Sequence, residues 1–402
     1  MAETKKRKHQ TKLKFPDGFL WGAGTSAYQV EGGIERNDWA VNRKLKPAGL
    51  ACDHYHKYRE DFALAKKMHH NAHRLSLEWS RIEPMSGVFD DHEIAHYLEV
   101  LKCLRKNKIK TFVTLHHFTN PIWISKQGGW AGAKTVWYFR RYVSKVCQAL
   151  GQYVDFWITI NEPNVYVGTS YTVGVWPPFK KSLIQSYFVY RNMLKAHNEA
   201  YRIIHYFFPH AQVGFSQDLA YNEPVDKRRF LDRLVVVLAD WFNVGFTYKR
   251  TKNDFIGLNH YFHNCLKFSF SKFVDRKTGK GDSTDKCWEI FPQAIYEVLL
   301  QLKKYDLPIY ITENGIADKR DAKRARYIES YLREIHKAIG RGVDVRGYLY
   351  WSLLDNYEWP MSEKNTGYEM KFGLVEVDFK TLGRAARKSA GYFAAICKSN
   401  KL

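Results

Sequence analysis

Short apolar runs alternate with longer amphipathic stretches along most of the chain. Eight runs have the length and composition of strands that are buried on both faces. They cover residues 19–25, 72–77, 110–115, 156–160, 212–215, 255–258, 309–312 and 345–351. Between several of them lie amphipathic stretches of helical length, at residues 54–67, 93–106, 134–150, 182–207 and 322–341. This order predicts parallel strands that are joined by helices.

Eight such units close naturally into an α/β fold, the (β/α)8 or TIM barrel. One barrel over residues 15–402, after a basic and mobile tail at residues 1–14, then accounts for the 402-residue length as a single catalytic domain. The alternative, an open doubly wound sheet, should carry a glycine-rich phosphate loop after its first strand. The chain offers only Gly22-Ala23-Gly24 there. A barrel places its active site at the C-terminal ends of its strands, so the polar residues at those ends are the candidates.

Two glutamates lie at matching strand ends. Glu162 follows the run 156–160 within Asn161-Glu162-Pro163, and Glu313 follows the run 309–312 within Glu313-Asn314-Gly315. Either tripeptide alone could be a turn or a helix cap. Two carboxylates at one barrel rim, however, are the pair of catalytic groups that cleavage of a glycosidic bond requires. One protonates the leaving oxygen, and the other attacks the sugar or activates water.

The other strand ends supply polar and aromatic companions for these glutamates. They are Gln29, Arg74, His117, Asn259, Tyr261 and Trp351. Each has a purely structural alternative: His117 could be a buried core histidine, Arg74 a partner for any acid, and Trp351 barrel packing. Their shared location favours function, because amides, imidazoles and indole rings suit the hydroxyls and the apolar face of a sugar.

Charge is the unusual part of the composition. The chain has 63 basic and 41 acidic residues, a formal net charge of +22, which invites a nucleic-acid interpretation. Only residues 5–8 form a dense basic run near the start, and the other basic residues are dispersed. We therefore expect no nucleic acid as the main partner, and we interpret the charge as a property of the surface.

Other classes of protein are disfavoured by what the sequence lacks. No apolar run approaches the ~20 residues of a membrane span, and no apolar signal core is present, so we expect no membrane partner and a cytoplasmic location. The six cysteines contain no Cys-x-x-Cys pair, which favours free thiols. No His-Glu-x-x-His or Gly-x-Ser-x-Gly motif occurs. We expect neither a metal nor a cofactor.

Five longer motifs resemble those of glycoside hydrolase family 1, the β-glucosidase and β-galactosidase family. They are FLWGAGTSAYQVEG at 19–32, NAHRLSLEWSRIEP at 71–84, TINEP at 159–163, ITENG at 311–315 and YWSLLDNYEW at 350–359. The resemblance covers about residues 15–396. It implies a retaining β-glycosidase that hydrolyses terminal non-reducing β-D-glucosyl residues, and also galactosyl or fucosyl residues, through a covalent glycosyl-enzyme intermediate. A β-glucoside or an oligosaccharide would be its substrate.

The resemblance also implies roles for single residues. Glu162 matches the general acid/base and Glu313 the nucleophile, with their carboxyl groups ~5 to 5.5 Å apart. Asn161 matches the residue that hydrogen-bonds the sugar 2-hydroxyl. Arg74 and Tyr261 would hold Glu313 ionised. The remaining substrate contacts would come from Gln29, His117, Asn259, Glu358 and Trp359, with Trp351 as a platform and Trp288 as a wall of the aglycone site.

The chain departs from the family pattern in several places. Phe118 follows His117 where many members have tryptophan. The loop at residues 360–366 is longer than usual, and Phe372 is placed near the glycone pocket. The stretch from residue 221 to 254 is shorter than in most relatives, from which we expect a more open aglycone side.

Several alternatives stay open at this point. In 6-phospho-β-glycosidases a small residue replaces Glu358, and a lysine and a tyrosine replace Met370 and Phe372. A carboxylate there repels phosphate by about 1 kcal/mol or more at ~4 Å. Lys364 and Lys371 nonetheless keep that activity open. Transglycosylation is not distinguished from hydrolysis, whereas an inactive sugar-binding barrel should have lost a carboxylate. The preference among glucose, galactose and fucose, the aglycone and the oligomeric state are left undetermined.

Overall fold

Eight parallel strands form a closed barrel in the computed structural model, which describes residues 12–269, 273–277, 282–360 and 367–402. The strand order around the barrel is β1-β11-β10-β7-β5-β4-β3-β2. Their bounds are β1 Leu20–Gly24, β2 Ala72–Ser76, β3 Lys110–Thr114, β4 Phe156–Asn161, β5 Gln212–Asp218, β7 Ile256–Asn259, β10 Ile309–Asn314 and β11 Val345–Tyr350. Each of the eight predicted runs forms one of these strands, and the predicted (β/α)8 barrel is confirmed.

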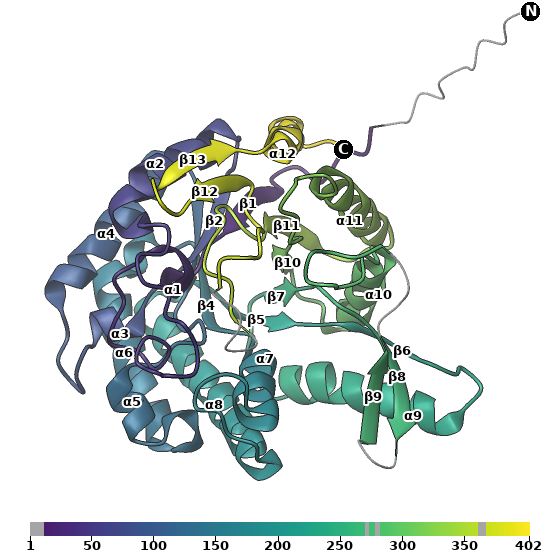
Figure 1. Cartoon of the computed structure of the whole chain (residues 1–402), viewed down its shortest axis with the longest axis horizontal. Coiled ribbons are helices and arrows are strands. Elements are labelled where there is room, and N and C mark those ends of the chain that lie inside the picture. The colour runs from purple at the N-terminus through teal and green to yellow at the C-terminus, as the bar shows by residue number, and fades with distance from the viewer. Residues whose placement is uncertain (1–11, 270–272, 278–281, 361–366) are drawn as a thin grey trace, which may run out of the picture.

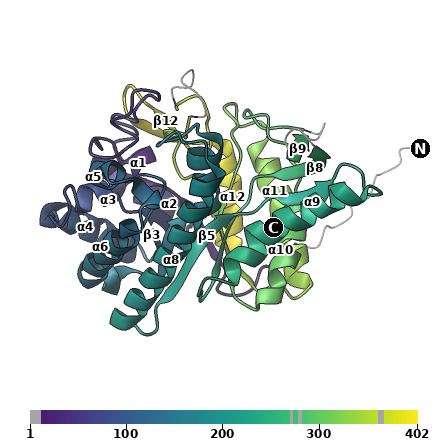
Figure 2. The ribbon, with the colours of Figure 1, turned by 90° about the horizontal axis from the view of Figure 1, so that it is seen from below.

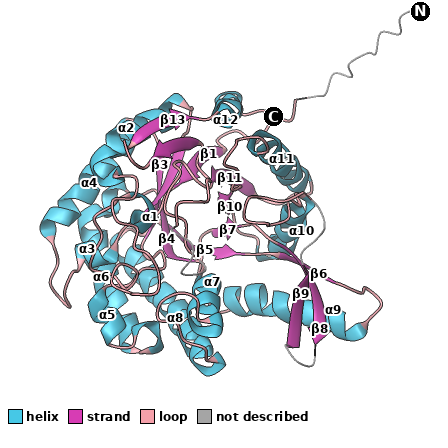
Figure 3. Cartoon of the chain, viewed as in Figure 1, coloured by secondary structure: helices cyan, strands magenta, loops and turns pink. Residues whose placement is uncertain are grey.

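Helices surround the barrel, and Figure 3 shows them as an outer layer around the ring of strands. The longer ones are α2 His54–Lys67, α4 Asp91–Lys106, α6 Lys134–Leu150, α8 Leu183–Phe207, α10 Gln293–Leu302, α11 Arg324–Gly340 and α12 Lys388–Ser399. The five predicted helices agree with α2, α4, α6, α8 and α11 to within two residues at each end. Helices α10 and α12, and helix α9 (Phe230–Asp240) on the outer side of the barrel, were not predicted.

Shorter helical segments lie in the loops or directly continue a longer helix. The four-to-five-residue α-helices are α1 Ala27–Val30, α3 Trp79–Ile82, α5 Ile122–Lys126 and α7 Pro163–Val167. Turns of 3-10 helix cover Gly129–Ala131, Gly151–Tyr153 and Lys303–Tyr305, and π-helical turns cover Gly168–Val173 and Trp241–Phe246. Helix α7 directly follows β4 and positions the chain after Glu162.

Apolar side chains fill one end of the barrel interior. Ala72, Phe112, Ile158, Phe255, Tyr310 and Leu349 form this cluster. The rings of Phe112 and Phe156 stack with centroids 4.2 Å apart. Two residues further along β2 and β3 the side chains are polar, and Arg74 Nε donates to Thr114 Oγ1 at 3.1 Å. Because alternate strand residues face the same side, the interior changes from apolar to polar toward the C-terminal ends of the strands.

Two small sheets lie outside the barrel. Strands β6 (Tyr221–Pro224), β8 (His263–Ser269) and β9 (Phe273–Lys277) form one, next to helix α9 (Phe230–Asp240). Strands β12 (Val375–Asp378) and β13 (Gly383–Ala386) form the other. Figures 1 and 2 show α9 and the β8–β9 hairpin on the side of α10 and α11. The stretch at residues 221–254 thus contains β6 and α9, and a more open aglycone side stays a prediction.

The two ends of the described chain lie together. Leu13 and Leu402 exchange backbone hydrogen bonds of 3.0 and 2.9 Å. Residues 1–11, most of the predicted tail, and residues 361–366, most of the longer loop, lie outside the described residues. All six cysteines are free thiols. No helix in the described part of the chain is long and apolar enough to cross a membrane.

The apolar cluster inside the barrel leads to a prediction about stability. Phe112 is 0% exposed and contacts the rings of Phe156 on β4, Tyr310 on β10 and Phe255, which directly precedes β7. Phe112→Ala should therefore lower the free energy of unfolding by about 3–5 kcal/mol, because it leaves a cavity that its neighbours fill only in part. Urea unfolding measures the change. Leu183→Ala is the control: Leu183 is 76% exposed, and its replacement should change stability by less than about 0.5 kcal/mol. Equal losses in both variants would contradict the prediction.

Candidate active site

A cavity of about 750 Å³ lies at the C-terminal ends of the barrel strands. This is where the barrel prediction places the active site. Nine of the twelve predicted site residues line it: His117, Asn161, Glu162, Tyr261, Trp288, Glu313, Trp351, Glu358 and Trp359. Gln29, Arg74 and Asn259 are not among the described lining residues. Arg74 and Asn259 form hydrogen bonds with the lining residues Glu313 and Glu162, and Gln29 forms one with the segment that carries Glu358.

Glu313 is held at both carboxylate oxygens. It lies near the end of β10, and the pairing of β10 with β7 sets it opposite Asn259. Arg74 Nη1 donates to Glu313 Oε1, and the Tyr261 hydroxyl donates to Oε2 at 2.9 Å. Arg74 is 0% exposed and also donates to the Thr312 carbonyl at 3.3 Å. The carboxylate is therefore fixed in orientation and paired with a buried cation.

Glu162 has a different environment. Its carboxylate accepts a hydrogen bond of 2.5 Å from Asn259 Nδ2, and no described cation forms a salt bridge with it. Its backbone φ is +43°, in the left-handed region that costs non-glycine residues roughly 1–2 kcal/mol. The Glu162 N–H donates to the Ser216 carbonyl at 2.7 Å, and Pro163 begins α7. These contacts hold a turn that directs the side chain into the cavity.

Hydrogen bonds through Arg74, Asn161 and Asn259 connect the two glutamates. Asn161 Oδ1 accepts from Arg74 Nη2 at 2.5 Å and from Asn259 Nδ2 at 3.1 Å. Its Nδ2 lies 3.3 Å from His117 Nε2. Burial, reinforced by the charge of Arg74, holds the pKa of His117 well below its usual range. The ring is therefore neutral, and with Nε2 as acceptor the proton is on Nδ1, which has no partner among the described residues.

The two carboxyl groups have unequal proton affinities. Burial, together with the charges of Glu313 and Asp218, raises the pKa of Glu162 well above its usual range. Burial also raises the pKa of Glu313, but the Arg74 charge and the Tyr261 hydroxyl oppose that rise. Glu162 is therefore the group that keeps a proton near neutral pH, and Glu313 is the group that ionises first.

Gln29 lies behind the cavity wall. Its amide nitrogen donates to the Tyr357 carbonyl at 2.8 Å and to Asn356 Oδ1 at 3.3 Å, and its oxygen accepts from Ser26 at 2.7 Å. Since all three bonds are internal, Gln29 supports the segment that carries Glu358. The contact with substrate hydroxyls that the resemblance implies for Gln29 stays a prediction.

Glu358 is paired with a lysine that was not predicted. Lys286 Nζ lies 3.1 Å from Glu358 Oε1, and Glu358 Oε2 is buried without a partner among the described residues. The ammonium also lies over the rings of Trp288 and Phe372, at 4.8 and 5.4 Å from their centroids. Lys371, considered earlier for a phosphate, lies instead over the Phe379 ring, and Lys364 is outside the described residues.

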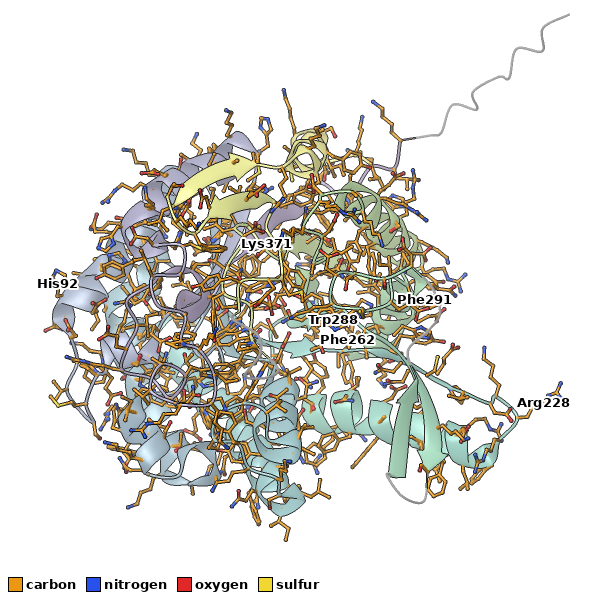
Figure 4. All side chains as sticks on the ribbon, in the orientation of Figure 1. His92, Arg228, Phe262, Trp288, Phe291 and Lys371 are labelled. Carbon is orange, nitrogen blue, oxygen red and sulfur yellow. The ribbon has the colours of Figure 1, made fainter. Side chains whose placement is uncertain are left out.

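Aromatic rings form much of the cavity wall. Trp351 and Trp359 each lie nearly parallel to His117, with ring centroids 6.0 Å away. Trp288 and Phe262 pack edge to face at 4.7 Å, and Figure 4 shows them side by side near the barrel opening. Phe372 also lines the cavity, where it was placed from the sequence. Flat apolar surfaces beside buried polar groups match the two sides of a sugar ring.

Asp218 was also missed. It ends β5, lines the cavity, and its charge contributes to the raised pKa of Glu162. The predicted fifth strand ended at Phe215, three residues too early, so Asp218 was not recognised as a strand-end residue. The rule that found Glu162 and Glu313 would have found it. Lys286 carried no such signal, because it lies in an irregular segment between β9 and α10.

Known proteins resemble this chain over nearly its full length. A family model described as "Glycosyl hydrolase family 1" matches residues 11–243 and 243–402. Beta-glucosidase A from Thermotoga maritima is 31% identical over 97% of this chain and 99% of its own length. A 6-phospho-beta-galactosidase from Clostridium acetobutylicum is 30% identical over 96% of this chain and 98% of its own. A solved beta-glycosidase from Pyrococcus horikoshii superposes with a TM-score of 0.91 and 34% identity, covering 97% of this chain and 96% of its own.

The coupling between the two glutamates can be tested directly. Glu313→Gln removes a negative charge that raises the pKa of Glu162, so that pKa should fall. Infrared difference spectra over a pH titration would follow the carboxyl band, which is assigned by its loss in Glu162→Gln. Glu376→Gln is the control, since Glu376 is exposed and pairs with Arg387. An unchanged Glu162 titration in Glu313→Gln would contradict the coupling.

Proposed function

The chain belongs to glycosyl hydrolase family 1 and is a glycosidase of the β-glucosidase and β-galactosidase type, and we propose that it cleaves terminal β-D-glucosyl residues with retention of configuration. Galactosyl and fucosyl residues are further substrates. The observation that carries the proposal is the unequal environment of two carboxyl groups buried in one cavity. One is paired with Arg74 and Tyr261, and the other accepts only an amide hydrogen bond among the described residues.

In the first step Glu313 acts as the nucleophile. A carboxylate oxygen bonds to the anomeric carbon while the bond to the aglycone oxygen breaks, and Glu162 gives its proton to that oxygen. The product is a glycosyl ester of Glu313 and a free alcohol. The Arg74 and Tyr261 contacts keep Glu313 ionised and oriented, so that less reorganisation is needed as the ester forms.

In the second step Glu162 acts as the base. It takes a proton from water, the water oxygen bonds to the anomeric carbon, and the ester bond to Glu313 breaks. Loss of the neighbouring negative charge in the ester lowers the pKa of Glu162, which suits its change from acid to base. An alcohol in place of water would give transglycosylation by the same step.

The surrounding polar groups would bind the sugar. Arg74 and Asn259 both donate to Asn161 Oδ1 and so orient its amide nitrogen, which we assign to the 2-hydroxyl. His117 Nδ1 and Glu358 Oε2 are buried and without partners among the described residues, so hydroxyl groups of a substrate can satisfy them. Trp351 supplies an apolar face for the ring.

A 6-phospho-β-glycoside is the second candidate substrate, because Lys286 places an ammonium in the same cavity. One relative is named a 6-phospho-beta-galactosidase. Against this substrate, Glu358 neutralises Lys286, and its second oxygen would face the phosphate. The pair as a whole carries no net charge. We therefore rank the unphosphorylated glycoside first.

Replacement of Glu313 and replacement of Glu162 should lower catalytic activity in different ways. Glu313→Ala should lower kcat on a chromogenic β-glucoside by about 10⁴-fold or more, since the nucleophile is lost. Azide should restore turnover and give a glycosyl azide of inverted configuration. Glu162→Ala should lower kcat by about 10²- to 10⁴-fold, least for aglycones that need no protonation. The parent and the variants are assayed on β-glucoside, β-galactoside and β-fucoside.

Glu369→Ala is the control for these variants, because Glu369 lines the same cavity but carries no proposed chemical role. Unchanged turnover by Glu313→Ala, or activity of the parent on none of the glycosides, would refute the mechanism.

Lys286 distinguishes the two candidate substrates. The parent should prefer the β-glucoside to its 6-phosphate. In Lys286→Met, kcat/KM for the phosphorylated substrate should fall about tenfold or more, since a charge-assisted hydrogen bond contributes about 1.5–3 kcal/mol. The β-glucoside should lose about threefold or less. Lys371→Met, whose ammonium lies over Phe379, should change neither value. A parent that prefers the phosphorylated substrate would reverse the ranking.

A further inference from the structure

Three donor atoms of metal-binding type converge on the small sheet beside the cavity. They are Glu223 Oε1, His263 Nε2 and Cys265 Sγ, which lie within 4.8 Å of one another. Parallel pairing sets Glu223 on β6 opposite Cys265 on β8, and His263 precedes Cys265 by two residues, on the same face. We propose that these residues form a zinc site, which is independent of the glycosidase chemistry.

The spacing of the donors matches tetrahedral zinc. Nε2 to Oε1 measures 3.2 Å, Sγ to Oε1 3.8 Å and Sγ to Nε2 3.9 Å. Typical bonds of ~2.0–2.1 Å to nitrogen or oxygen and ~2.3 Å to sulfur place tetrahedral donors roughly 3.3–3.6 Å apart. Side-chain shifts of a few tenths of an ångström therefore bring the three donor atoms to zinc-binding distances, and no backbone rearrangement is required.

His263 is already oriented as a metal ligand. Its Nδ1 lies 2.8 Å from Glu289 Oε2, and its ring stacks on Phe291 at 4.3 Å and on Tyr221 at 5.6 Å. A carboxylate on the second ring nitrogen is the usual partner of a zinc-bound histidine, since it fixes both the tautomer and the ring. With the Nδ1 proton directed to Glu289, Nε2 is left to bind the cation.

The donor set selects the metal. Thiolate and imidazole ligands favour zinc over calcium or magnesium, which prefer oxygen ligands. The Cys265 thiolate and the Glu223 carboxylate together balance the two charges of Zn²⁺, and the second oxygen of Glu223 lies 3.5 Å from Lys227. Among the described residues the group has three protein ligands, so water would occupy the fourth position.

Without a metal, the cluster would be a histidine between two carboxylates. That arrangement accounts for Glu223, His263 and Glu289, and among the described residues it leaves the Cys265 thiol only contacts of 3.8 Å with Glu223 Oε1 and 3.9 Å with His263 Nε2. The two accounts therefore differ on the thiol: a zinc site needs it as a ligand, and a histidine held by two carboxylates does not.

A zinc ion at this site would cross-link the segments that form the outer wall of the cavity. On the opposite face of the sheet, Asn222 and Asn264 line the cavity, and Asn264 Nδ2 donates to Asn222 Oδ1 at 2.9 Å. Glu289 follows Trp288, which also lines the cavity. A cation held by β6 and β8, with Glu289 behind it, thus connects the three segments that carry these wall residues. Its expected role is structural.

Metal binding by the full chain tests the proposal. The protein is stripped with EDTA and dialysed against Zn²⁺ buffered by a weak chelator, and its zinc content is measured by mass spectrometry. The parent should hold one zinc per chain, and Cys265→Ala and His263→Ala should lose it. Cys103→Ala is the matched control, because Cys103 is a partly buried free thiol on α4. Glu313→Gln should also keep its zinc, so the result does not depend on activity.

Cobalt supplies a second readout that identifies the ligand. The parent loaded with Co²⁺ alone should show a thiolate-to-cobalt charge-transfer band, which Cys265→Ala loses and Cys103→Ala keeps. Zinc should raise the Tm of the parent and not that of Cys265→Ala. A metal-free circular dichroism spectrum that matches the parent shows that each variant folds. A parent without bound zinc, or with equal zinc in Cys265→Ala, would overturn the proposal.

Discussion

The buried guanidinium of Arg74 is the interaction on which the candidate site depends. It donates to Glu313, to Asn161 and to the Thr312 carbonyl, and it is fully enclosed by the barrel. A buried cation is costly unless it is paired, and a buried carboxylate is costly for the same reason. In the Arg74–Glu313 pair, each ion offsets the desolvation cost of the other. Glu162, without such a partner, is left as the carboxyl that retains its proton.

Barrel geometry brings these groups together from distant parts of the sequence. The interior is apolar around Phe112, and on β2 and β3 the polar layer begins two residues further along, at Arg74 and Thr114. Residues 74, 161 and 313 therefore converge because each lies in β2, β4 or β10 at the same end of one closed sheet. The β6–β8–β9 sheet, which lies outside the barrel, adds residues to the cavity wall. One of its faces lines the cavity, and the other carries the proposed zinc ligands.

The sequence predicted the barrel and the two glutamates for one reason: parallel strands buried on both faces leave continuous apolar runs, and the polar residues that follow them are conspicuous. Asp218 was missed because β5 continues past its apolar run. Lys286 and the Glu223–His263–Cys265 group were missed for a different reason. They lie on loops and on a small outer sheet, where no periodicity fixes which residues meet. The sequence even led us to expect no metal, since the proposed ligands at 223, 263 and 265 match no compact motif.

The most direct test of the central claim is the configuration of the first sugar released. Proton NMR during the first minutes of hydrolysis of an aryl β-glucoside resolves the two anomers of glucose before they interconvert. A nucleophilic Glu313 with Glu162 as acid and base predicts that β-glucose forms first and the α anomer appears only later. Initial formation of α-glucose would show that water attacks directly, and it would contradict the assignment of Glu313.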